Sequence, residues 1–455
     1  MSSTPPANTD TLQPSPDGAH NPYVGTTVAE RAAMLAHIGV ASADELFTPI
    51  PAAYRTPELR LPPPLSEQEL LRELSAIAGQ NRHTSELISF LGGGAQRHFV
   101  PSAVGHIVGR SEFYTAYTPY QPEISQGTLQ GAFEFQSLVC ELTGMDVANA
   151  GMYDGASAFA EACLMAVAAS GRRRIALLDS VNPAYAETVR TYASGHGLPV
   201  ELVPAAQPAL GDGHACLAAQ QPNGLGALEN VQALADAAHA AGALFIVDVD
   251  PISLGLLREP GAYGADIVTG SGQGLGGGLN YGGPHAGLFA CRERFLRQMP
   301  GRIVGQTRDL DGRTGYVLTL QTREQHIRRE RATSNICTSQ QLLALAAAVY
   351  LTLLGPAGLR QVAALCYHKA HYAAERMAAL SGFRLASDAP FFDEFALQCP
   401  RPPHEILPAL LERGILGGID VSDRVPNGLL IAVTELNPRA EIDALTEVLA
   451  QVARL

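Results

Sequence analysis

The chain has 455 residues, of which 46% are hydrophobic and 16% are charged, so it is too apolar to be disordered and long enough for two or more domains. Its net charge of −13 gives no electrostatic footprint for nucleic acid or for an anionic membrane surface. The longest nearly apolar run, Leu342 to Leu354, is shorter than the ~20 residues that span a bilayer, so we expect a soluble protein without a membrane segment. Seven scattered cysteines without a Cys-x-x-Cys pair favour reduced thiols and a cytoplasmic location.

The first 62 residues are expected to be a polar leader followed by a helical arm. Helical spacing covers Thr27 to Ile38 and a second short segment, Ser42 to Phe47. After a proline cluster, the Ser66 hydroxyl and the Glu69 carboxylate form a capping box that opens a helix running to Gly79. These segments bury too little to form a domain, so we expect them to wrap a larger body.

Helices and apolar strands then alternate, which predicts a mostly parallel sheet covered on both faces. We expect a large α/β domain over residues 63–338 and a small α/β domain over 339–455. In the large domain the predicted helices are 126–142, 156–169, 184–194 and 228–241, and the strands are 175–178, 200–203, 215–219, 244–247, 265–268 and 286–290. In the small domain we expect helices from 339, over 367–380, 405–413 and 440–452, with strands over 394–398 and 429–433.

The stretch Ala243 to Pro284 has the layout by which many pyridoxal-phosphate (PLP) enzymes hold their cofactor. Asp248 ends a buried strand, and the glycine-rich loop Gly270 to Gly278 follows about 25 residues later. In such enzymes the carboxylate binds the pyridinium nitrogen and a lysine on the loop forms the Schiff base. The loop has Gln273 and no lysine, and the only lysine of the chain is Lys369. The sequence therefore predicts a cofactor pocket that cannot hold PLP covalently.

Two features of this pocket have plain structural alternatives. Asp248 is either a pyridinium partner or a strand-end carboxylate that caps the next turn, and the missing lysine favours the turn cap. Ser157, with Gly155 and Ala156, opens a helix whose free amides either bind phosphate or are capped by Asp154. The two readings of Ser157 are equally well supported.

Other site classes find little support in the sequence. Gly272-x-Gly274-x-x-Gly277 matches a dinucleotide fingerprint, but further glycines and Pro284 follow where that motif needs a helix. The histidines, His98 among them, lack metal-ligand spacing, so no metal site is expected.

The loop Tyr117 to Glu123 carries the most distinctive polar side chains. Two prolines fix its backbone, and its tyrosines, glutamine and glutamate present polar tips, as in a ligand wall or a subunit contact. A second polar segment, Arg331 to Thr338, precedes the long helix.

Several long motifs resemble the glycine decarboxylase P-protein family, and the resemblance covers the chain from about Tyr23 to its last helix. The chain lacks the lysine, as the alpha subunit of the two-subunit form of that enzyme does. It departs from the family pattern in Gln96-Arg97-His98, where Tyr-Asp-His is common, and in Gly270-Ser271-Gly272-Gln273, where Gly-Glu-Gly-Gln is common. The motifs that carry the resemblance are Phe113 to Gly127, Thr143 to Asn149, Leu320 to Glu330 and Arg331 to Thr338.

The resemblance implies the fold, the cofactor and the partners. The fold would be that of the PLP-dependent transferases of fold type I, the aspartate aminotransferase type. PLP would be bound covalently on a homologous beta subunit, with this chain completing the shared site in an α2β2 assembly. In that family PLP reacts with glycine, carbon dioxide is lost, and the aminomethyl group passes to the lipoyl arm of the H-protein.

The site residues implied by this reading fall into two sets. A substrate-binding or interface set comprises Tyr117, Thr118, Tyr120, Gln121, Glu123, Ser125, His98 and Asn335, and a vestigial cofactor pocket comprises Ser157, Asp248 and Gln273. Two alternatives remain: a non-catalytic scaffold or regulatory subunit, and a self-sufficient PLP enzyme that uses Lys369.

Overall fold

The computed structural model describes residues 25–55, 61–332 and 334–452, and the chain divides into two compact units, residues 1–81 and 82–455. Each unit is described by itself. In its described residues, the first unit has the helices α1 (Val28–Ile38) and α2 (Glu67–Ala78) and the 3-10 turns η1 (Ala43–Phe47) and η2 (Ala52–Tyr54). The predicted capping box of α2 is present, because Ser66 Oγ accepts from the Glu69 amide while the Glu69 carboxylate accepts from the Ser66 amide. None of the described residues before Asn81 is buried within this unit.

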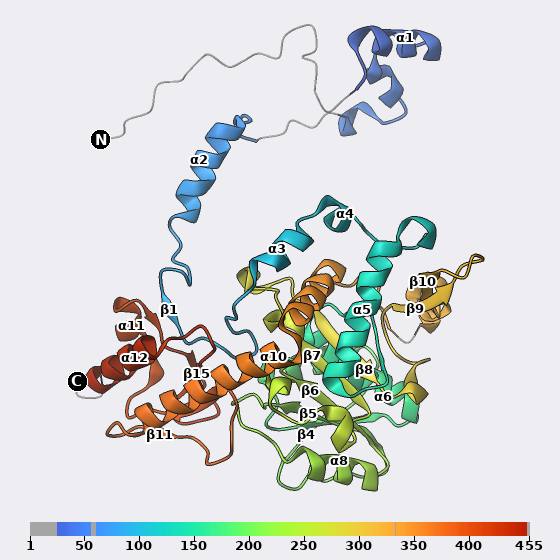
Figure 1. The fold of residues 1–455 in the computed structure, drawn as a ribbon. Helices are drawn as coiled ribbons and strands as arrows, with labels where there is room; N and C mark the ends of the chain where they lie inside the picture. The colour runs from blue at the N-terminus through green and yellow to red at the C-terminus, as the bar shows by residue number, and fades with distance from the viewer. Residues whose placement is uncertain (1–24, 56–60, 333, 453–455) are drawn as a thin grey trace, which may run out of the picture. The chain divides into compact units, whose positions relative to one another are not determined.

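The second unit is built on a seven-stranded sheet with the strand order β2-β8-β7-β6-β5-β3-β4 (Figure 1). Strands β3 to β7 run parallel, β8 is antiparallel to β7, and β2 is antiparallel to β8. Apolar side chains on both faces explain this arrangement, since parallel strands need helices on each side. The strands are β2 (Val147–Ala148), β3 (Arg174–Leu178), β4 (Val200–Val203), β5 (His214–Gln221), β6 (Leu244–Val249), β7 (Ile267–Ser271) and β8 (Gly287–Cys291).

Helices packed against this sheet complete the main hydrophobic core, which includes Phe159, Phe245 and Phe289. They are α5 (Gln126–Thr143), α6 (Gly155–Ser170), α7 (Pro183–Ser194), α8 (Val231–Ala240) and the long α10 (Gln341–Ala378), with the short α3 (Ser102–Val108), α4 (Ser111–Tyr114) and α9 (Gln325–Arg328) near the surface. The predicted class, a large α/β part with a mostly parallel sheet and a smaller α/β part, is confirmed.

The smaller part contains an antiparallel sheet with the order β11-β12-β15-β14 and its own hydrophobic core. Phe90, far upstream in the sequence, belongs to this second core, and β1 pairs in parallel with β13. The elements are β1 (Ile88–Ser89), β11 (Arg384–Leu385), β12 (Glu394–Gln398), β13 (Ile415–Leu416), β14 (Ile419–Asp420), β15 (Gly428–Ala432), α11 (Pro403–Glu412) and α12 (Arg439–Val452). The domain limits at residues 62 and 338 stay a prediction.

Helix α10 links the two cores, because its first part packs in the main core and its last part in the second. The sequence predicted two helices here, and the structure has one element with a kink at Gly355, where φ is +58° and Pro356 follows. Among the described helices α10 is long and apolar enough, by length and composition alone, to cross a membrane. Its apolar residues serve instead to bind both cores together, which explains its composition.

Two local predictions were wrong. The glycine loop begins later than expected, because Gly270 and Ser271 are the last residues of β7. A hairpin of β9 (Ile303–Arg308) and β10 (Thr314–Thr319) was not predicted at all. Its second strand is only half-buried and its first is exposed toward the turn, so neither shows a strong apolar alternation.

Candidate functional site

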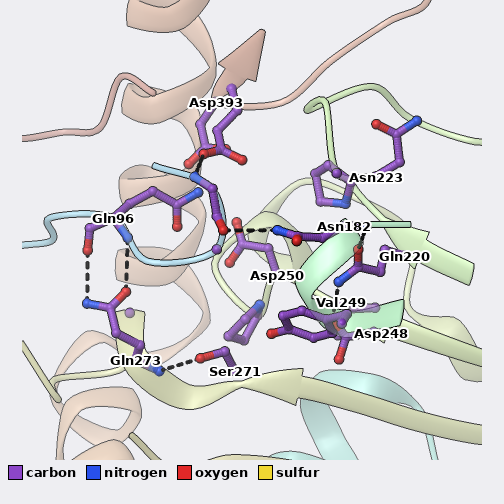
Figure 2. A pocket seen from close by; sticks show the side chains of 18 residues that line it. Gln96, Asn182, Gln220, Asn223, Asp248, Val249, Asp250, Ser271, Gln273 and Asp393 are labelled. Atoms are coloured by element: carbon purple, nitrogen blue, oxygen red, sulfur yellow. Dashed lines mark hydrogen bonds between the residues drawn. The ribbon is translucent and has the colours of Figure 1, made fainter. Parts of the chain in front are cut away.

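A polar pocket lies where β5, β6 and β7 end, the edge of a parallel sheet at which open α/β folds bind their ligands (Figure 2). Side chains from the smaller part close it from the opposite side. The lining includes Gln96, Asn182, Tyr185, Gln220, Asn223, Asp248, Asp250, Ser271, Gln273, Asp393 and Glu394.

Asp248 lies at the end of β6 and is held by both neighbouring strands. Its Oδ1 accepts from Thr269 Oγ1 at 2.8 Å on β7, and its Oδ2 accepts from Gln220 Nε2 at 3.1 Å on β5. Burial raises the pKa of the Asp248 carboxyl to about 7, despite these two hydrogen bonds. The expected role of Asp248 as a turn cap is wrong, because the carboxylate that caps the next turn is Asp250, whose Oδ1 accepts from the Ile252 amide at 2.9 Å.

Gln273 lies in the turn after β7, and its side-chain amide forms hydrogen bonds with backbone groups. Its Oε1 accepts from the Gln96 amide at 3.1 Å, and its Nε2 donates to the Gln96 carbonyl at 2.9 Å (Figure 2). The same Nε2 donates to the Gly278 carbonyl at 3.1 Å. The side chain is 3% exposed. The amide at the position expected for a lysine therefore ties two loops together.

Ser157 is part of the N-terminal cap of α6. The Asp154 carboxylate accepts from the Ser157 amide at 2.7 Å, and Ser157 Oγ accepts from the Asp154 amide at 3.2 Å. Of the two open readings, the structure has the cap. A carboxylate therefore occupies the helix end where a phosphate would need free amides.

These observations test whether the pocket fits PLP. It offers no lysine, and the lining carries Asp248, Asp250, Asp393 and Glu394 without a basic residue. Ser157, which was predicted to belong to this pocket, is not among its lining residues. An anionic phosphate would meet like charge here. The residues that line the pocket do not fit covalently bound PLP, and the placement of PLP on a partner subunit stays a prediction.

The tyrosine–proline loop lies outside this pocket, and most of its polar side chains are exposed. Tyr117 is 76% exposed and its hydroxyl lies 3.2 Å from Thr338 Oγ1, which connects the two polar segments singled out in the sequence. Gln121 and Glu123 are exposed, whereas Thr118 and Ser125 are half-buried. The backbone carbonyl of Ser125 accepts from the Leu129 amide as α5 begins.

Tyr120 covers a buried ion pair that the sequence did not reveal. Arg302 Nη2 donates to the Tyr120 hydroxyl at 3.3 Å, and Arg302 Nε lies 3.5 Å from Glu324 Oε2. The His326 ring meets the Tyr120 ring edge-on at 5.8 Å and lies 3.4 Å from the Glu324 carboxylate. Glu324 and His326 belong to one of the family-like motifs, but only the fold brings them beside Arg302 and Tyr120.

The structure separates His98 from the tyrosine–proline loop. Its Nδ1 lies 2.9 Å from Glu435 Oε2, and its ring lies against Gly274 at the edge of the polar pocket. Asn335 is exposed, in the segment that contacts Tyr117 through Thr338. The predicted substrate or interface set is therefore divided between two places, and its role stays a prediction.

Lys369 belongs to α10 and does not line the pocket. Its Nζ donates to the Glu435 backbone carbonyl at 2.5 Å.

The fold and the pocket define a member of the fold-type-I transferase class whose pocket lining contains no lysine. The family model for the glycine cleavage system P-protein matches residues 21–449. The chain is 52% identical over 441 residues to a probable glycine dehydrogenase (decarboxylating) subunit 1 of Thermomicrobium roseum, covering 93% of this chain and 98% of that one. It is 51% identical to the protein of the same name from Moorella thermoacetica, over 93% of this chain and 98% of that one.

A solved glycine decarboxylase (P-protein) of the glycine cleavage system, in inhibitor-bound form, superposes with a TM-score of 0.90 at 44% identity, covering 94% of this chain and 99% of that one. A sphingosine-1-phosphate lyase from Burkholderia pseudomallei matches with a TM-score of 0.62 at 16% identity, over 89% of this chain and 94% of that one, a likeness of fold alone. This chain belongs to the glycine cleavage system P-protein family. The predicted family, fold class and enzyme class are confirmed.

Proposed function

We propose that this chain is the subunit of glycine dehydrogenase (decarboxylating) that lacks the Schiff-base lysine and that it completes a shared active site with a homologous beta subunit. PLP, bound covalently to the beta subunit, would supply the electron sink for glycine decarboxylation. The lipoylated H-protein would accept the aminomethyl group, and two copies of each subunit would form an α2β2 assembly. The name "subunit 1" carried by the relatives supports a second, different subunit.

The observation that carries the proposal is the state of Gln273. Gln273 holds the loop in place through three hydrogen bonds but has no amine that could form a Schiff base. Both properties are expected of a subunit that does not bind the cofactor covalently. The fold is otherwise complete, with Asp248 still held at the end of β6.

The tyrosine–proline loop supports the partner contact. Tyr117, Tyr120 and Ile124 are 76%, 46% and 81% exposed, and tyrosines of this kind are enriched in protein interfaces. Arg302 donates to the Tyr120 hydroxyl and is itself paired with Glu324, so two buried side chains support the exposed tyrosine. We place the contact with the beta subunit and its substrate at this loop, with Asn335 at its border.

The test compares the purified chain alone with the chain mixed with its beta subunit. We expect PLP absorbance and glycine–bicarbonate exchange only in the mixture, because the lone chain has no lysine in its pocket. Robust exchange by the lone chain would overturn the proposal.

Substitutions in the exposed loop separate this function from a scaffold role. Tyr120→Phe removes the hydroxyl that accepts from Arg302 but keeps the ring, and Glu123→Gln removes an exposed charge, so both changes are small and lie in the exposed loop. We expect either change to lower the turnover of the assembled enzyme about tenfold or more, with assembly unchanged by size-exclusion chromatography. Full activity in both variants would favour a scaffold.

Borohydride reduction of the lone chain with PLP tests the self-sufficient alternative. The proposal predicts no adduct at Lys369, because its amine is bonded to the Glu435 carbonyl and lies outside the pocket lining.

A further inference from the structure

The polar pocket carries an excess of negative charge. Asp248, Asp250, Asp393 and Glu394 all line it, and no lysine, arginine or histidine does. Carboxylates removed from water are stable only when they are paired, hydrogen-bonded or protonated. The pocket therefore disfavours an anion and favours a cation.

Two of these carboxylates accept hydrogen bonds from donors of the chain. Asp248 accepts from Thr269 and Gln220, and Glu394 Oε1 accepts from the Gly93 amide at 2.6 Å. Their charge is at least partly compensated by these donors.

Asp250 and Asp393 differ, because each has a buried Oδ2 without a hydrogen-bond partner in the described part of the chain. Asp393 is 1% exposed, so its carboxylate lies fully inside. Asp250 is half-buried as a residue, but its Oδ2 is inaccessible. Burial, and the nearby charge of Asp250, raise the pKa of the Asp393 carboxyl. An orphaned buried carboxylate oxygen is costly, and two of them in one lining indicate a ligand with hydrogen-bond donors.

The arrangement fits an organic cation better than a metal ion. In the part of the chain that the structure describes, the three side chains whose ligand atoms converge within 4.8 Å are His98, Cys366 and Glu435, and they lie outside the pocket lining. Asp250 follows β6, whereas Asp393 precedes β12 in the smaller part (Figure 2). Oxygens approaching from two separate elements suit the diverging N–H groups of an ammonium ion.

We propose that this pocket binds a small organic cation with a primary ammonium group, whose N–H donors are accepted by the carboxylates of Asp250 and Asp393 in the lining. This goes beyond the proposed function and does not depend on it, because the ligand binds to this chain alone.

The experiment measures the thermal midpoint and ligand-observed NMR of the full chain with methylammonium chloride. Sodium chloride and tetramethylammonium chloride at equal concentration control for ionic strength, and tetramethylammonium also lacks N–H donors. We expect saturable binding of methylammonium alone. Glycine should bind at least tenfold more weakly, because its carboxylate meets the acidic lining.

Asp393→Asn and Asp250→Asn should each weaken methylammonium binding at least tenfold. Asp311→Asn removes the same charge at an exposed site and should leave binding unchanged. If one of the two pocket variants fails to fold, methylammonium binding by the other variant still tests the proposal. The proposal is overturned if tetramethylammonium or Mg²⁺ binds as well as methylammonium, or if a folded pocket variant binds like the wild type.

Discussion

At the scale of single residues, hydrogen bonds within the chain hold the polar side chains of the pocket. Gln273, at the position expected for a lysine, carries an amide that satisfies the Gln96 amide and two carbonyls. Asp248 is held at the end of β6 by hydrogen bonds from Thr269 and Gln220, although burying its carboxyl group is unfavourable. Each residue has a structural role that a substitution can measure.

Asp248→Asn should stabilise the chain at neutral and alkaline pH. The amide fits, because its oxygen can accept from Gln220 Nε2 and its nitrogen can donate to Thr269 Oγ1. The pKa of Asp248 rises from 3.8 to about 7 on folding, so the folded chain holds a proton between these values that the unfolded chain has lost. The wild type therefore loses stability as the pH rises through this window, with the full cost above pH 7.

The gain in unfolding free energy for Asp248→Asn should approach zero near pH 4 and reach on the order of 4 kcal/mol at pH 8. Thermal unfolding by circular dichroism across this range checks it, with Asp311→Asn as the exposed control. A variant that is equally stabilised at all pH values would contradict the assignment.

Gln273→Ala should lower the free energy of unfolding by roughly 2–3 kcal/mol, because the buried Gln96 amide loses its acceptor and two carbonyls lose a donor. Urea unfolding measures the change. Gln130→Ala, at an exposed helical position, is the matched control and should change stability by less than about 0.5 kcal/mol. Equal stability of the two variants would show that the Gln273 hydrogen bonds contribute nothing net.

At the scale of elements, the tyrosine–proline loop is supported from two directions. Its first half contacts the segment before α10 through Tyr117 and Thr338, and its second half rests on Arg302 and Glu324. Gln126 at the start of α5 also bonds Tyr316 of β10, accepting from its amide at 2.9 Å and donating to its carbonyl at 2.9 Å. The unpredicted hairpin therefore helps to position the loop.

Glu324→Gln should be one of the more destabilising single changes in this region. Arg302 and Glu324 side chains are 6% and 5% exposed, so the neutral amide would leave a buried guanidinium without its counter-charge. The expected loss in unfolding free energy is about 3 kcal/mol. Asp311→Asn breaks the Arg313–Asp311 pair, 78% and 69% exposed, and should cost less than about 1 kcal/mol. Similar losses in the two variants by urea unfolding would contradict the buried pairing.

At the scale of the whole molecule, the strongly periodic segments were predictable and the pairings between distant segments were not. Strand β12 and helices α5 and α12 match their predicted ranges within about two residues, because their apolar spacing is regular. Asp309 to Gly312 was an available turn signal for the missed hairpin: the Asp309 carboxylate accepts from the Asp311 and Arg313 amides.

No comparable signal in the sequence indicated which residues would line the pocket. Asp393 lies far along the chain from Asp250, in an apolar strand context, and only the meeting of the two cores brings it to the pocket. The sequence showed that Gln273 stands where a lysine was expected. It did not show the hydrogen bonds from Gln273 to Gln96, because the loop around Gln96 has no sequence pattern that predicts its path.

The cysteines give a test of the whole fold, since all seven lie in the part of the chain that the structure describes and are free thiols. Cys337 is exposed, Cys140 is half-buried and the other five are buried. Burial raises the pKa of Cys140 to about 11 and those of Cys291 and Cys399 to about 12, which leaves little of the reactive thiolate at neutral pH. A disulfide reagent such as DTNB should therefore modify one thiol quickly in the native chain and all seven in denaturant. Cys337→Ser should remove the fast phase and leave the others unchanged, whereas a second fast thiol in the native chain would mean that one of the two cores opens on the timescale of the reaction.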